Sequence, residues 1–224
     1  MSRIDKMVAE LARQEPGFNI SYKTGSKLMK FLGKLAFFNP DFMTKYATVV
    51  GDTVYFPNRE FVTQQPKGKL VTIAHEYQHV KDCKRMSFPL FFLAYFSPQI
   101  LAPFMLFFCF LYWWLGLLLF ALFLSPIPSV GRMIIEKRGY IMTLFASNEL
   151  YLELNLNVRL RRELLLGKIK RIEKEFITSS YYFMWPFGVK KELKEAVDKI
   201  LSGEILQEGD SFLEVKAALH NSKL

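Results

Sequence analysis

The stretch VTIAHEYQHVKD, residues 71–82, places two histidines four positions apart, with a glutamate directly after the first. The chain has only 3 histidines, and this stretch contains two of them, His75 and His79. Apolar residues recur around them at helical spacing: Leu70, Ile73, Ala74, Tyr77 and Val80. The spacing predicts a helix with an apolar backing face, on which both imidazoles point to the same side.

The His-Glu-x-x-His pattern has a defined metal chemistry. Two imidazoles at this spacing bind one ion from the same side, and zinc suits them because it accepts nitrogen and oxygen ligands in a tetrahedron. Glu76 follows the first ligand, where it can act as general base toward a water and then donate a proton to a leaving amine. The alternative is a surface helix with two solvated histidines. Because the chain is so poor in histidine, we expect a zinc site.

A catalytic zinc site also needs a third protein ligand and an open position for water. The remaining histidine, His220, lies in a polar C-terminal segment. Cys83 continues the stripe of His79, but the helix axis carries it away from the two imidazoles. Cys109 lies in a long apolar run. The third ligand is therefore expected to be a carboxylate.

Three carboxylates are candidates. Asp82 follows His79 by three residues, which is too close along the helix to complete the same site. Glu136 lies in the helical apolar pattern RMIIEKRGYIM, residues 132–142. We therefore expect Glu136 to be the third ligand, with Glu149 as the reserve candidate.

The apolar run separates the histidines from Glu136. From residue 86 to residue 131 the chain has no Asp, Glu, Lys or Arg, a length that favours membrane insertion over a helix pair buried in a soluble core. The prolines of SPQILAP, residues 97–103, predict a break between a short arm, 88–97, and a longer arm, 104–125. The longer arm is long enough to span a bilayer alone.

Basic residues flank both ends of this run: Lys81, Lys84 and Arg85 before it, and Arg132, Lys137 and Arg138 after it. Positive flanks favour the cytoplasmic side, so the run is expected to enter and return on one side as a membrane-embedded hairpin, spanning or re-entrant. Glu136 requires the same return, because ligands of one ion must meet. We expect a membrane-associated protein with its catalytic part on the cytoplasmic side.

The remaining segments predict a mainly α fold with a small β-sheet. Residues 4–11 and 26–38 have amphipathic helical patterns, and ATVVGDTVYFPN, residues 47–58, predicts a strand or tight hairpin. Residues 159–175 predict a basic helix, and 190–224 predict two short polar helices. The aromatic segment 181–188 predicts an interfacial anchor or a packed turn. The net charge of +9 favours an anionic membrane surface over nucleic acid as partner.

These residues resemble the gluzincin-type zinc metallopeptidases. The order of the segments is similar to that in HtpX-like and CAAX-prenyl-protease-like integral-membrane peptidases: HEYQH, then an apolar hairpin, then a glutamate-bearing helix. The resemblance covers roughly residues 47–150. The resemblance implies that His75, His79 and Glu136 bind zinc and that Glu76 is the general base. It also implies that TVVGDTVYFP, 48–57, is an edge strand on which a peptide or protein substrate lies extended.

The sequence departs from that family at three places. The family has an aspartate four residues after the metal-binding glutamate, which supports a ligand histidine, whereas this chain has Tyr140. A Gly-Asp pair usually follows the second histidine, whereas here only Asp82 is nearby. The membrane spans that precede the motif in the family are absent. Tyr140 and Asp82 are therefore the candidates for supporting the metal ligands.

The predicted organisation has four parts. Residues 1–87 form the first part of a zincin-like domain with the motif helix, 88–128 the hairpin, 129–176 the Glu-bearing and basic helices, and 177–224 a C-terminal helical region. A non-enzymatic membrane anchor or scaffold with a vestigial or structural motif is the main alternative. A deformylase-like hydrolase is disfavoured, because its cysteine ligand precedes the motif and both cysteines here follow it.

Overall fold

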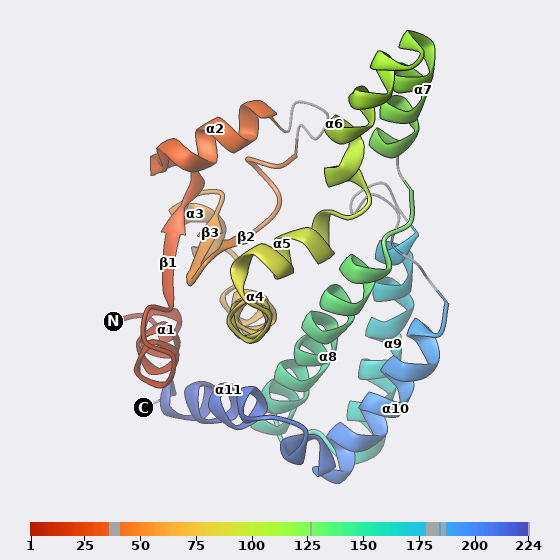
Figure 1. Ribbon diagram of the computed structural model, residues 1–224. Helices are drawn as coiled ribbons and strands as arrows, with labels where there is room; N and C mark the ends of the chain where they lie inside the picture. The colour runs from red at the N-terminus through yellow and green to blue at the C-terminus, as the bar shows by residue number, and fades with distance from the viewer. Residues whose placement is uncertain (36–40, 126, 178–183, 185–186, 224) are drawn as a thin grey trace.

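The computed structural model of the protein describes residues 1–35, 41–125, 127–177, 184 and 187–223. Helices dominate, and one three-stranded sheet lies in the N-terminal part (Figure 1), so the expected mainly α class with a small sheet is confirmed. The aromatic segment 181–188 falls mostly outside the described residues.

Several of the helices match the sequence patterns. Their bounds are α1 Arg3–Gln14, α2 Lys27–Leu35, α3 Arg59–Thr63, α4 Pro66–Met86, α5 Phe88–Phe96, α6 Ala102–Met105, α7 Trp113–Leu124, α8 Val130–Glu153, α9 Val158–Phe176, α10 Val189–Ser202 and α11 Asp210–Asn221. Short 3-10 turns occupy Lys23–Gly25, Gln99–Leu101, Leu106–Phe110 and Glu204–Gln207. The predicted motif helix, the basic helix and the two polar C-terminal helices are thus confirmed as α4, α9, α10 and α11.

The sheet corrects one expectation. Strands β2 (Thr48–Val50) and β3 (Thr53–Phe56) form the predicted hairpin, with Val49 paired antiparallel to Val54. Strand β1 (Asn19–Tyr22), which the sequence did not predict, pairs parallel with β3 on its other side. β3 is therefore the central strand, and only the β2 half of residues 48–57 lies at an edge. The expectation that the whole segment is one edge strand was wrong.

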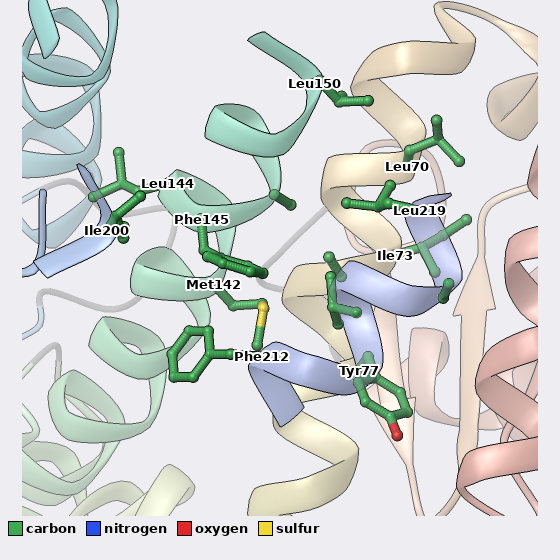
Figure 2. Close-up of a cluster of buried hydrophobic side chains, with 14 of the residues drawn as sticks. Leu70, Ile73, Tyr77, Met142, Leu144, Phe145, Leu150, Ile200, Phe212 and Leu219 are labelled. Carbon is green, nitrogen blue, oxygen red and sulfur yellow. The ribbon is translucent and has the colours of Figure 1, made fainter. Parts of the chain in front are cut away.

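Helices α4 and α8 pack side by side and form the centre of the core. The five predicted backing residues of α4, from Leu70 to Val80, are all buried. Figure 2 shows Ile73 and Tyr77 of α4 near α11 and Met142 and Phe145 of α8. The rings of Phe145 and Phe212 meet edge to face at 5.2 Å, which joins α8 to α11. This packing fixes the motif helix against the helix that carries Glu136.

The apolar run forms a hairpin, but not with the expected arms. α5 and the helical segment Gln99–Phe110 meet at an angle of 97°, so residues 97–103 bend the chain without reversing it. The reversal comes later, at Leu111 and Tyr112, where Tyr112 has an extended backbone and α7 then packs back against α6. The expectation of one continuous arm over residues 104–125 is therefore wrong.

In the described part of the chain, no single helix has both the length and the apolar character for crossing a bilayer, although the bent pair of Phe88–Phe96 and Gln99–Phe110 satisfies both together. The hairpin projects from the body at the upper right of Figure 1. Its turn is strongly exposed: Phe107 66%, Phe110 88%, Leu111 68% and Trp113 72%. Such a contiguous apolar surface is typical of a membrane or protein contact.

Candidate metal centre

α4 and α8 bring three ligand-type side chains to one point. The Nε2 atoms of His75 and His79, one turn apart on α4, lie 3.0 Å from each other. Glu136 Oε2 of α8 lies 3.5 Å from Nε2 of His75 and 3.7 Å from Nε2 of His79. All three residues are buried, and their ligand atoms lie within 4.8 Å of one another. The predicted group of His75, His79 and Glu136 is therefore assembled in space.

The charges in this group depend strongly on one another. Burial opposes the imidazolium form of His79, but the Glu136 carboxylate outweighs burial and raises the pKa of His79 to about 9. Burial likewise opposes ionisation of Glu136, but the two imidazoles lower the pKa of this carboxyl well below its usual range. The His79 imidazole and the Glu136 carboxyl thus each stabilise the charged form of the other. A metal ion bound here would take the place of a proton on His79, because ligand imidazoles are neutral.

Two features of the geometry fit a metal ion. Glu136 Oε2 is buried without a hydrogen-bond partner among the described residues, although it faces both imidazoles. Gly139, one turn after Glu136, provides the space for those rings, because an added Cβ would lie 2.7 Å from Cε1 of His75 and 2.9 Å from Cε1 of His79. Two imidazole nitrogens and one carboxylate oxygen form a donor set that zinc accepts with an open position.

Thr143 on α8 contacts Nδ1 of His75, and the sequence patterns had not indicated this residue. Its hydroxyl oxygen lies 3.0 Å from Nδ1 of His75. If Nδ1–H donates to this hydroxyl, the lone pair of Nε2 is directed at the metal position. Thr143 lies seven residues after Glu136 and four after Gly139, so helical spacing from Glu136 was the signal that could have identified it.

Replacing Thr143 with valine is expected to weaken metal binding about 10-fold, because supporting partners of ligand histidines contribute about 10- to 100-fold to affinity. Valine keeps the shape of the side chain but cannot accept a hydrogen bond from Nδ1–H. The measurement is competition for zinc with a chromogenic chelator. The matched control is Thr72→Val on α4, where the hydroxyl donates to the Gly68 carbonyl of its own helix. Equal affinity of the Thr143 variant and the control would contradict this role.

Glu76 lies between the two histidines in the chain and is partly buried. Burial raises its pKa above the ordinary value, and the nearby imidazoles oppose that shift. A second positive charge comes from the fully buried Lys23, which follows β1 and donates to the carbonyl oxygen of Phe42 at 2.5 Å. Burial lowers the pKa of Lys23 to about 8, and attraction to Glu76 opposes the shift. Burial and the Glu136 carboxylate thus raise the pKa of Glu76, while the two imidazoles and Lys23 oppose that shift.

The other predicted site residues, Asp82, Tyr140 and Glu149, are not part of the group formed by His75, His79 and Glu136. Asp82 is buried and accepts from Arg138 at 2.8 Å and from Gln78 at 3.0 Å, so it links α4 to α8 beside the site. The ring of Tyr140 packs edge-on against His75 at 5.0 Å. Glu149 lies 13 residues beyond Glu136 on the same helix, about 20 Å along its axis, in a hollow lined by Lys216. Glu149 is therefore too distant to be a ligand.

Comparisons with known proteins add no relative: no protein-family model, curated protein or solved structure matches this chain.

Proposed function

We propose that this protein is a membrane-associated, zinc-dependent metallopeptidase with a gluzincin-like site in a zincin-like core that the apolar hairpin interrupts. The observation that supports it is the convergence of His75 Nε2, His79 Nε2 and Glu136 Oε2 beside Glu76. The three residues come from two helices that the hairpin separates in sequence, and Glu136 Oε2, which faces both imidazoles, has no hydrogen-bond partner among the described residues.

The residues divide the work of peptide hydrolysis. His75, His79 and Glu136 would hold the ion, which would supply Lewis-acid activation of water and of the substrate carbonyl. Glu76 takes a proton from the water as the water oxygen attacks the carbonyl carbon. Glu76 then gives a proton to the leaving amine as the C–N bond breaks. Burial raises the pKa of Glu76 above its ordinary value, which favours its holding the proton between the two transfers.

The small sheet offers a place for the substrate. Among the described residues, β2 pairs with β3 on one side only, and β2 packs beside α4, which carries the motif. An extended peptide can add to such an edge through main-chain hydrogen bonds. In this proposal an unfolded or extended peptide segment of a protein lies along β2 with its scissile bond over Glu76.

The apolar hairpin is proposed to insert into the membrane from the cytoplasmic side. Its exposed turn, with Phe110 and Trp113 at the surface, has the composition of a bilayer-inserted segment. The net charge of +9 favours an anionic membrane face.

The test is cleavage of an unstructured fluorogenic peptide by the purified protein in anionic lipid vesicles. We expect cleavage that stops when the metal is removed by a chelator and returns with one equivalent of zinc. Vesicle binding without stoichiometric zinc and without cleavage would instead favour the non-enzymatic membrane anchor or scaffold.

A further inference from the structure

The first helix of the apolar hairpin covers the candidate metal centre. Phe91 of α5 lies with its ring 6.5 Å from that of His79, and the Tyr95 hydroxyl donates to Glu136 Oε1 at 2.6 Å. The approach is close because α8 has Gly131 at the crossing, where an added Cβ would lie 2.3 Å from the carbonyl oxygen of Ala94. The apolar hairpin, whose composition predicts membrane insertion, therefore also contacts Glu136.

The two oxygens of Glu136 have different surroundings. Oε1 accepts the Tyr95 hydroxyl, whereas Oε2 faces the Nε2 atoms of His75 and His79 and has no hydrogen-bond partner among the described residues. A carboxylate held by one oxygen in this way offers the other as a single ligand. It is also hindered from rotating to bind through both oxygens, which would occupy the open position that water needs.

We infer that Tyr95 is a positioning residue of the metal centre, which holds Glu136 as a ligand through Oε2 alone and makes the apolar hairpin a structural part of the site. The inference rests on the metal site of the proposed function and extends it, because the hairpin then contributes to metal binding as well as to membrane association.

Tyr95 is itself held in place by polar contacts at the base of the hairpin. Arg132 Nε donates to the Tyr95 carbonyl oxygen at 2.9 Å, and the guanidinium lies 5.3 Å from the centre of the Tyr95 ring. Gln99 Nε2 in turn donates to the carbonyl oxygens of Ser125 and Ile127 at 3.3 and 3.0 Å, which joins the bend after α5 to the exit of the hairpin. Arg132 thus ties α5 to the helix that carries Glu136, and Gln99 ties the bend after α5 to the exit of the hairpin.

The experiment compares Tyr95→Phe with Tyr112→Phe, which removes the same hydroxyl from an exposed tyrosine at the turn of the hairpin. Full-length protein is loaded with Co²⁺, and its visible absorption spectrum and its Co²⁺ affinity are measured. We expect Tyr95→Phe to change the spectrum and to weaken binding about 10-fold, while Tyr112→Phe matches the wild type. Thermal unfolding of the metal-free proteins shows that each variant is folded.

A second comparison separates positioning from general loosening. In Glu136→Ala protein, which keeps only the two histidines, the added Tyr95→Phe change is expected to leave the residual Co²⁺ affinity within about twofold, because the residue it positions is gone. A further loss in that background overturns the inference. So does an unchanged spectrum and affinity in Tyr95→Phe protein whose wild type binds Co²⁺, a result that leaves the proposed function intact. A wild type that binds no Co²⁺ overturns both.

Discussion

Glu76→Gln protein is expected to lose peptide cleavage by about 10² to 10⁴-fold while it retains zinc, because general-base catalysis contributes rate factors of that size. Glutamine has nearly the same shape as glutamate but cannot take a proton from water at neutral pH. His75, His79 and Glu136 are untouched, so the ligand set stays complete. Cleavage rates and zinc content are measured on the same preparations.

The matched control is Glu204→Gln, an exposed glutamate in the 3-10 turn Glu204–Gln207 far along the chain. This control is expected to cleave at the wild-type rate. Full activity in Glu76→Gln protein would refute the role of Glu76. Loss of zinc together with activity would show that Glu76 acts on the fold of the site instead of on the reaction.

Gly139→Ala is expected to weaken zinc binding about 100-fold or more, although it adds only one methyl group. That methyl would lie 2.7 Å and 2.8 Å from Cε1 and Nε2 of His75, and 2.9 Å from Cε1 of His79. Contacts this short require both rings to move, and a ligand set tolerates displacements of only about 0.5 Å. Zinc affinity by chelator competition is the measurement, with cleavage expected to fall in parallel.

Gly167→Ala provides the matched control, because Gly167 lies inside α9 with nothing within 4 Å of an added Cβ. Alanine there is expected to leave zinc affinity unchanged and to stabilise the fold by about 0.5–1 kcal/mol, since glycine is disfavoured in helix interiors. The same change is therefore expected to weaken zinc binding when made on α8 and to leave zinc binding unchanged when made on α9. Wild-type zinc affinity in the Gly139 variant would show that the imidazoles do not depend on this space.

Local periodicity explains which parts of the structure could be predicted from the sequence. The spacing of His75 and His79, and of the apolar residues behind them, is set within one helix, and α4 follows it. Gly139 and Thr143 follow Glu136 at positions three and seven, on the same face of α8, so helical spacing contained a signal for both that was not used. Tyr140, which the departure from the family pattern indicated, packs its ring against His75, whereas the hydroxyl 3.0 Å from Nδ1 of His75 belongs to Thr143.

Contacts between distant segments could not be predicted from the sequence. Tyr95 is 41 residues from Glu136, and no spacing rule connects a residue of an apolar run to a ligand on another helix. β1 was missed because its pairing with β3 joins segments far apart in sequence. The turn of the hairpin was misplaced because proline was used as the signal. The prolines produce a bend of 97°, whereas the reversal at Leu111 and Tyr112 has neither proline nor glycine.

The most direct test of the central claim is the position of zinc in metal-loaded protein, measured by anomalous diffraction at the zinc absorption edge. The account predicts one ion per chain, bound by Nε2 of His75 and His79 at about 2.0–2.1 Å and by one oxygen of Glu136 at about 2.0–2.2 Å, with the fourth position free of protein. An ion bound elsewhere, or one held by the histidines with the Glu136 carboxylate out of coordination range, would contradict it.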